Sequence, residues 1–232
     1  LTKLTTLDMY TSQLTGTIPT EIGQLTNLGQ LALSVNNLFG TIPTSIGLLS
    51  SLYFIGFFNN KLTGTLPTEI GNLKNVTGIY FQANNFNGTI PTEVGFMTSL
   101  QTLWLLDSQF TGTIPTEIGL LTNVNRLDLS NNQITGTVPT EIGRLTFQKE
   151  LSLQSKQQIN GTNPQAIQFL TNLVALRLQD CQFTGTIPTE IGLLTFLNEL
   201  SLQSNQQING TVPLEIQFLT NLVALDFGST NL

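Results

Sequence analysis

Apolar residues recur along this chain in a fixed order. One copy of the pattern has the pair Leu31 and Leu33, followed by Leu38, Ile42 and Ile46. The one-residue gap within the pair predicts a short β-strand with a single buried face. The predicted strand cores are Leu7/Met9, Leu31/Leu33, Ile55/Phe57, Ile79/Phe81, Leu103/Leu105, Leu127/Leu129, Leu151/Leu153, Leu176/Leu178, Leu200/Leu202 and Leu225/Phe227.

A second motif, Gly-Thr-x-Pro, recurs with the strands at spacings of 24 or 25 residues. It accounts for all the prolines, which stand at 19, 43, 67, 91, 115, 139, 164, 188 and 213. A fixed period of this length predicts a solenoid, in which each unit buries its apolar face against its neighbours. We therefore expect one elongated domain over residues 1–232. Because the chain starts and stops inside a repeat, we expect its natural end caps to lie outside this segment.

The full unit reads L-x-x-L-x-x-L-x-L-x-x-N-x-L-x-G-x-I-P-x-x-I-G-x-L, and it covers essentially the whole chain. It resembles the leucine-rich repeat in its plant-type, 24-residue form. The resemblance implies a mostly β member of the α/β repeat solenoids. Its right-handed coil would be curved, with a concave parallel β-sheet of about ten strands and short second strands at the Gly-Thr-Ile segments. It also implies a non-catalytic recognition module, like receptor-type ectodomains and secreted proteins of this class.

The turn after each strand has a polar position that Asn often occupies. We expect the Asn side chains to form a ladder of hydrogen bonds to the backbone, with Cys181 as a packed thiol in the same place. Residues 145–178 and 194–227 are near-copies that depart from the pattern. There we expect Gln157 and Gln206 to replace the ladder Asn, and Asn163 to fall at an inward position.

Composition argues against several functions. The net charge of −6, with only 8 Lys and Arg, disfavours a nucleic-acid binder, and no apolar run is long enough to cross a membrane. With no His and one Cys, we expect no metal, no cofactor and no enzymatic activity. A column of Glu residues recurs in the Pro-Thr-Glu-Ile-Gly segments, but its repetition predicts a solvated rim rather than a catalytic pair.

The residues that alternate with the strand leucines point out of the core and predict an exposed aromatic patch on the concave face. Such patches are typical of protein contacts, so we expect a protein or peptide ligand there rather than a glycan. The predicted contact residues are Tyr10, Phe54, Phe58, Tyr80, Gln82, Trp104, Leu106, Asp107, Arg126 and Asp128.

Threonine suggests a second function. Outward Thr-x-Thr pairs would form a grid similar to the ice-binding faces of β-solenoid antifreeze proteins, although Thr is also simply a good exposed strand residue. The candidate ice-binding residues are Thr15, Thr17, Thr41, Thr63, Thr65, Thr89, Thr111, Thr113, Thr135 and Thr137. A third possibility is a structural subunit of a larger assembly.

Four sequons, at Asn75, Asn87, Asn160 and Asn209, are candidate N-glycosylation sites. Glycans would obstruct a flat ice-binding face and favour secretion. We therefore expect an extracellular or endomembrane location, as in the ectodomain of a longer membrane or secreted protein.

Overall fold

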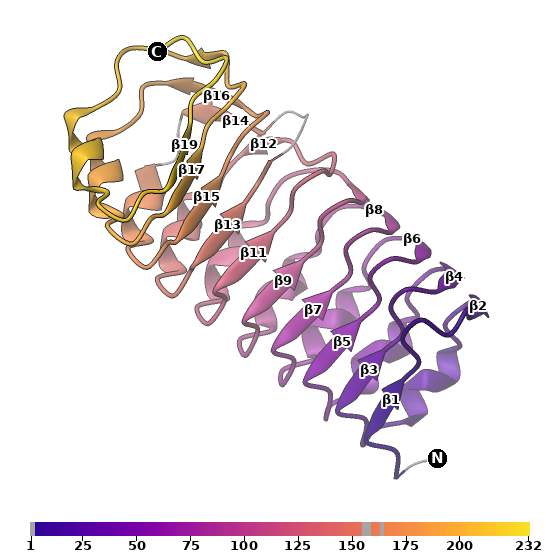
Figure 1. Ribbon diagram of the computed structural model, residues 1–232. Helices are drawn as coiled ribbons and strands as arrows, with labels where there is room; N and C mark the ends of the chain where they lie inside the picture. The colour runs from indigo at the N-terminus through magenta and orange to yellow at the C-terminus, as the bar shows by residue number, and fades with distance from the viewer. Residues whose placement is uncertain (1–2, 155–158, 163–164) are drawn as a thin grey trace.

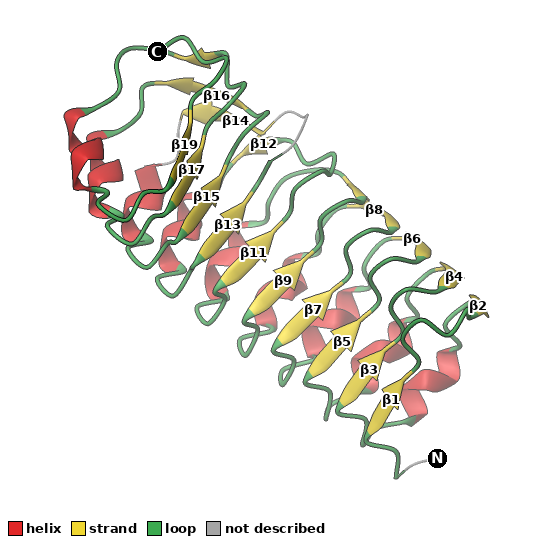
Figure 2. Cartoon of the chain, in the orientation of Figure 1, coloured by secondary structure: helices red, strands yellow, loops and turns green. Residues whose placement is uncertain are grey.

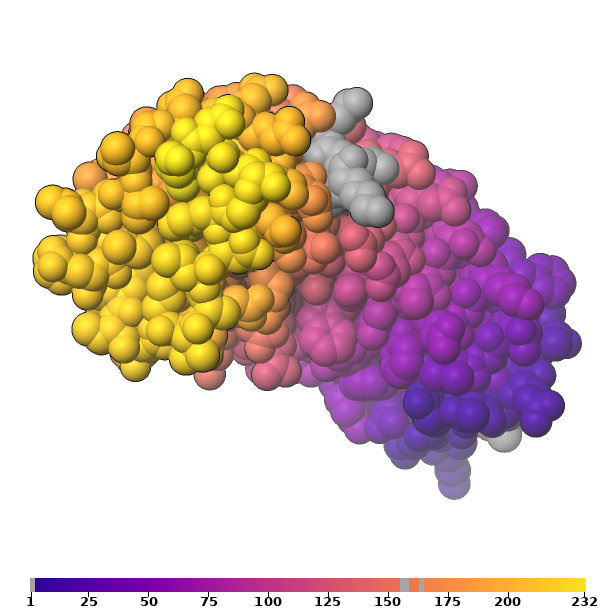
Figure 3. All heavy atoms as spheres, turned by 45° about the horizontal axis from the view of Figure 1, so that its top comes forward, coloured from indigo at the N-terminus to yellow at the C-terminus, as the bar shows by residue number. Residues whose placement is uncertain are grey.

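The computed structural model describes residues 3–154, 159–162 and 165–232. The chain winds as a curved, elongated coil in which each repeat forms one turn (Figure 1). In the space-filling view the turns pack against one another, and the N- and C-terminal repeats lie at opposite ends (Figure 3). This is the predicted solenoid.

The odd-numbered strands form one parallel ten-stranded sheet, in which each strand pairs with the next odd-numbered strand along the chain. Leu31 pairs with Leu7 and with Ile55, so the sheet repeats the leucine register of the sequence and confirms the predicted strands. The strands are β1 (Thr6–Asp8), β3 (Gln30–Ala32), β5 (Phe54–Gly56), β7 (Gly78–Tyr80), β9 (Thr102–Trp104), β11 (Arg126–Asp128), β13 (Glu150–Ser152), β15 (Ala175–Arg177), β17 (Glu199–Ser201) and β19 (Ala224–Asp226).

Shorter second strands form the predicted flanking sheet, in a five-stranded and a four-stranded part. Most of them precede the Gly-Thr-Ile segments instead of lying at them, and only β12 and β14 include the motif threonine. Backbone bonds from Gln133 N to Phe110 O (2.6 Å) and from Thr135 N to Gly112 O (2.7 Å) connect the two parts. The strands are β2 (Thr15–Gly16), β4 (Asn37–Gly40), β6 (Lys61–Gly64), β8 (Asn85–Gly88), β10 (Gln109–Phe110), β12 (Gly136–Thr137), β14 (Ile159–Thr162), β16 (Gln182–Gly185) and β18 (Gln207–Ile208). Several end at the motif glycine; Gly40, for example, has φ of 77°, a conformation that disfavours a side chain.

Each return path contains a short 3₁₀ helix, and these helices line the side opposite the ten-stranded sheet (Figure 2). Where the preceding residue is described, it is a proline whose fixed φ suits a helix start, such as Pro43 at −70°. The helices are η1 (Thr20–Gln24), η2 (Thr44–Leu48), η3 (Thr68–Asn72), η4 (Thr92–Phe96), η5 (Thr116–Leu120), η6 (Thr140–Arg144), η7 (Gln165–Phe169), η8 (Thr189–Leu193) and η9 (Leu214–Phe218).

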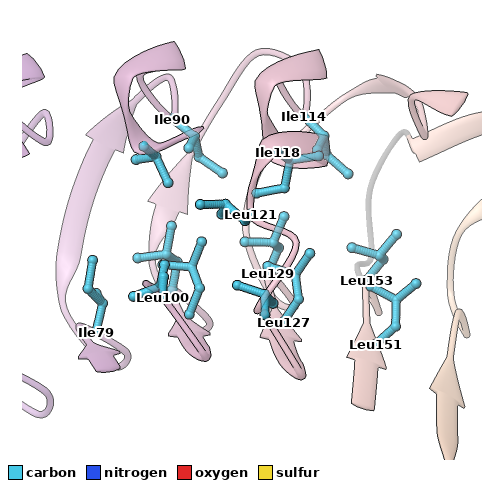
Figure 4. Close-up of a cluster of buried hydrophobic side chains, with 14 of the residues drawn as sticks. Ile79, Ile90, Leu100, Ile114, Ile118, Leu121, Leu127, Leu129, Leu151 and Leu153 are labelled. Carbon is cyan, nitrogen blue, oxygen red and sulfur yellow. The ribbon is translucent and has the colours of Figure 1, made fainter. Parts of the chain in front are cut away.

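One continuous apolar core runs through the coil. Side chains from the strands and the 3₁₀ helices of successive repeats converge on it, as for Leu127 of β11 and Ile118 of η5 (Figure 4). Ring stacking adds to the packing, with the Phe57 and Phe81 centroids 5.1 Å apart. The core is therefore shared between neighbouring turns, as the repeat pattern predicts.

The predicted Asn ladder is present, but one of its residues differs from the prediction. Asn205, not Gln206, occupies the ladder in the penultimate turn: it is fully buried, and its Nδ2 donates to Leu178 O at 2.8 Å. The extra residue of this repeat therefore follows the ladder position instead of preceding it. Cys181 is packed as expected, with Sγ 3.4 Å from Leu153 O. The predictions for Gln157 and Asn163 lie outside the described residues.

Candidate functional site on the concave sheet

The candidate site lies on the outer face of the ten-stranded sheet, where three side chains from neighbouring strands touch. Phe54 of β5, Tyr80 of β7 and Trp104 of β9 form what we call the aromatic cluster. The Phe54 and Tyr80 centroids are 5.2 Å apart with the rings tilted by 31°, and the Tyr80 and Trp104 centroids are 5.2 Å apart in an edge-to-face contact. All three side chains are half-buried, so they keep surface available for a ligand.

Glycines on the same face make room for these rings. A Cβ added to Gly78 would lie 2.7 Å from Cε2 of Tyr80, and one added to Gly56 would lie 3.1 Å from Cε1 of Phe54. Each ring therefore leans along its own strand into the space that a side chain would otherwise fill. In the sequence this arrangement corresponds to Phe54-x-Gly56 on one strand followed by Gly78-x-Tyr80 on the next, a pattern that the positions of the aromatic residues alone do not reveal.

A second row runs parallel to the aromatic cluster. The Tyr10 and Phe58 rings approach to 6.1 Å between centroids, two strands apart, and the small Ser34 on the intervening turn is 1% exposed. Gln82 and Leu106 continue the row and are half-buried. The Gln82 Oε1 atom is buried and has no hydrogen-bond donor among the described residues.

Beyond Trp104 the face becomes charged. Arg126 Nε lies 3.3 Å from Glu150 Oε1, and Arg177 Nε donates to Glu199 Oε1 at 2.7 Å. Both guanidinium groups therefore have carboxylate partners on the neighbouring strand. The bidentate Arg177 pair, together with Glu150 and Asp128 nearby, raises the pKa of that guanidinium.

Two aspartates complete the predicted contact set, and neither forms an ion pair within the described part of the chain. Asp107 is exposed and accepts a bond of 2.8 Å from Asn131 Nδ2. Asp128 accepts from Ser130 N at 3.0 Å and from the Ser130 hydroxyl. Burial raises the pKa of Asp128 above its ordinary value, against the lowering effects of the Ser130 bonds and Arg177, and Asp107 raises it further.

The ten predicted contact residues thus do not form one continuous contact surface. Tyr80 touches both Phe54 and Trp104, and Tyr10 and Phe58 form a separate pair. Arg126 turns toward Glu150, a partner that the sequence pattern does not identify because side-chain rotamers determine it.

The threonines of the flanking sheet lie at the surface, with Thr111 and Thr135 half-buried and the other candidates exposed. Their arrangement differs from a rectangular grid. Phe39 pairs with Lys61 rather than with the equivalent Thr63, so the ladder steps back by two residues at each repeat and the rows run obliquely. The γ-methyl groups have a common direction: that of Thr41 lies 2.7 Å from a Cβ placed on Gly64.

The four candidate glycosylation residues are exposed. Asn75 differs from the other three because its Nδ2 donates to Ser50 O at 2.9 Å, a bond that a glycan on that nitrogen would disturb. Asn87, Asn160 and Asn209 lie in or beside the second strands, on the same side as the threonines.

In the part of the chain that the structure describes, no group of three or more His, Cys, Asp or Glu side chains is placed to hold a metal ion. No helix in the same part is long and apolar enough to cross a membrane.

Comparison with known proteins places this geometry in a family. The Leucine Rich Repeat model matches residues 3–25, 123–145 and 172–194, and the structure carries the same strand, turn and 3₁₀ unit through the repeats between them. The chain is a leucine-rich repeat protein. A search of curated proteins gave no match.

Several solved structures superpose closely on this one. The crystal structure of a TDR receptor shares 32% identity over 99% of this chain and 40% of its own, with a TM-score of 0.95. The ectodomain of the Arabidopsis receptor kinase HAESA, in complex with an IDA peptide hormone, shares 31% identity over 93% of this chain and 36% of its own, with a TM-score of 0.88. A plant ice-binding protein shares 27% identity over 94% of this chain and 69% of its own, with a TM-score of 0.82.

The present chain matches only part of each of these longer chains. This leucine-rich repeat chain spans about 40% of the TDR receptor chain and 36% of the HAESA ectodomain. The likeness extends along nearly all of the present chain, so it confirms the curved solenoid with a concave parallel sheet.

Proposed function

We propose that this leucine-rich repeat chain is a non-catalytic recognition module that binds a peptide or an extended protein segment across its concave sheet. The observation that carries the proposal is the aromatic cluster, in which Phe54, Tyr80 and Trp104 from three successive strands form one half-exposed apolar surface. Trp and Tyr are enriched among the residues that dominate binding energy at protein interfaces.

Rigidity supports the same conclusion. Tyr80 contacts both of the other rings, and Phe54 and Tyr80 lie over Gly56 and Gly78, so little side-chain freedom is lost when a ligand covers them. The HAESA ectodomain, which shares this fold, is described in complex with a peptide hormone. By analogy we propose an extracellular or endomembrane location for this chain, as part of a receptor-like or secreted protein.

The test is selection of peptides from a randomised, end-capped library on the purified protein, followed by titration against variants. Trp104→Ala and Tyr80→Ala should each weaken binding of the selected peptides by about 2 kcal/mol, or roughly 30-fold in Kd, with folding retained. Phe39→Ala is the matched control, because Phe39 is a 52% exposed aromatic residue on the flanking sheet.

Two results would contradict the proposal. One is that selection yields no peptide that binds the folded protein, and the other is that the selected peptides bind Trp104→Ala and Tyr80→Ala as tightly as the parent. Loss of stability with unchanged affinity would show that the rings serve packing alone.

Ice binding is a second candidate, and one observation favours it. Exposed threonines repeat along the flanking sheet with their γ-methyl groups directed toward the next repeat, and the fold is shared with a plant ice-binding protein. Against it, Phe39 and Asn87 interrupt the rows, and both are exposed. Coil curvature further limits the area that could match an ice plane.

We expect weak or no thermal hysteresis from the purified protein, and the double variant Thr65→Tyr with Thr113→Tyr should leave peptide binding unchanged. Strong freezing-point depression in the parent that disappears in this variant would establish the second candidate in place of the first.

A further inference from the structure

The side of the concave face next to the aromatic cluster carries negative charge. Asp128 of β11 is the register partner of Trp104, and Asp107 lies in the turn after β9. Both carboxylates accept hydrogen bonds from uncharged donors, Asn131 Nδ2 for Asp107 and Ser130 N for Asp128. Hydrogen bonds of this kind orient a carboxylate but leave its formal charge in place.

Among the described residues, the two arginines on this part of the face already have acidic partners. Arg126 pairs with Glu150 and Arg177 with Glu199, so these four charges balance in two pairs. Arg177 lowers the pKa of Asp128 only through a more distant charge interaction, and the charge of Asp107 raises that pKa. Two carboxylates beside the aromatic rings therefore remain without a neutralising partner among the described residues.

Aromatic faces and carboxylates attract the same kind of group. A Lys or Arg side chain gains from a ring face through its quadrupole and from a carboxylate through its charge. An acidic side chain at the same place would face like charge, and a purely apolar one would leave the carboxylates desolvated without compensation. Charge complementarity therefore favours a cationic occupant at this end of the patch.

We propose that the peptide ligand carries a Lys or Arg side chain that binds beside Trp104, between Asp107 and Asp128, and an apolar side chain that covers Phe54 and Tyr80. This rests on the proposed function and names the chemistry of its ligand. Tyr80 and Asp128 lie on strands two steps apart, a distance of about 10 Å. An extended peptide spans that distance in about three residues, which sets the spacing of the two side chains.

The experiment uses peptides selected from the end-capped library and resynthesised in matched sets, with the basic residue kept or replaced by Met or Glu. Binding is measured with the parent protein and with Asp107→Asn plus Asp128→Asn. Asp8→Asn plus Asp226→Asn is the control, because Asp8 and Asp226 stand in the same strand position as Asp128. Each accepts the same local bond, from Tyr10 N at 3.0 Å and from Gly228 N at 2.9 Å.

Selected peptides should contain Lys or Arg about three residues from an aromatic or aliphatic residue. The Asp107/Asp128 substitutions should weaken binding of these peptides at least tenfold, and the control substitutions less than twofold. Added salt should reduce the difference in affinity between the parent and the Asp107/Asp128 variant. In the variant, the Lys and Met peptides should bind alike.

Two outcomes separate this inference from the function on which it rests. Peptides that lose affinity for Trp104→Ala but bind the Asp107/Asp128 variant normally would overturn the cationic ligand and leave the recognition module standing. Failure to select any peptide would overturn both proposals together.

Discussion

The replacement Asn84→Ala tests the hydrogen-bond ladder that joins successive turns of the coil. Asn84 is 6% exposed, and its Oδ1 accepts from Leu62 N at 3.0 Å. Its Nδ2 donates to Phe57 O and to Phe81 O, each at 3.0 Å. Alanine removes these three bonds and leaves buried backbone groups of two neighbouring turns unpaired.

The expected loss follows from those contacts. At about 1 kcal/mol for each bond, the free energy of unfolding should fall by about 3 kcal/mol, measured by urea denaturation with far-UV circular dichroism. Asn75→Ala is the matched control, nine residues earlier in the same repeat: its side chain is exposed, and the structure gives it one such bond, from Nδ2 to Ser50 O at 2.9 Å. That change should reduce the free energy of unfolding by about 1 kcal/mol or less.

The loss in the free energy of unfolding for Asn84→Cys should lie between the losses for Asn84→Ala and Asn75→Ala, because Cys181 shows that a thiol can occupy this position beside a carbonyl. If Asn84→Ala destabilises the protein no more than Asn75→Ala does, the ladder does not contribute to coupling between turns and the reasoning is refuted.

Three further predictions concern stability. Gln148 is fully buried at a position where the near-copy has Leu197; its Oε1 has no donor among the described residues, whereas its Nε2 donates to Glu150 O. Because leucine removes the unpaired oxygen but also this bond, Gln148→Leu should raise the free energy of unfolding by about 1 kcal/mol in denaturant titration; an unchanged or lower value would contradict this. Leu103→Ala should lower it by about 2–5 kcal/mol and broaden the melting transition, since damage to a middle repeat uncouples the two halves; a sharp, parent-like melt would contradict the stacked core. Burial raises the pKa of Asp128 above its ordinary value of 3.8, so the ionisation of this carboxyl opposes folding. The free energy of unfolding of Asp128→Asn relative to that of the parent should therefore rise as the pH increases through the acid range, and then level off. The groups around Asp128, namely Asp107, Arg126, Glu150 and Arg177, are unchanged in that comparison; a relative stability that falls with increasing pH would show that the pKa is lowered instead.

Much of the fold could be predicted because one pattern repeats. The pair Leu31 and Leu33 alternates with outward residues, and its recurrence determines both the strand and its register with β1 and β5. The same periodicity identified Asn84 as a ladder residue. Where the repeat length changed, the prediction failed: the extra residue near Asn205 left two positions that the pattern alone could not distinguish.

The candidate site was predictable only in part. Alternation placed Tyr80 and Trp104 on the outer face, but the direction in which their rings lean depends on the space left by glycines such as Gly78. The ion pair of Arg126 with Glu150 depends on rotamers that no periodicity specifies. The oblique threonine rows follow from the backbone path between the two sheets, which sets the register of the flanking strands independently of the repeat length.

The central claim is that a ligand covers the aromatic cluster, and the chain carries its own reporter for this. Trp104 is the only tryptophan of the protein and is half-buried in the cluster. Acrylamide quenching of its fluorescence can be measured with and without a saturating selected peptide. The account predicts that the peptide protects Trp104 and that quenching decreases. Unchanged quenching at saturation, with binding verified by calorimetry, would place the binding surface elsewhere and contradict the claim.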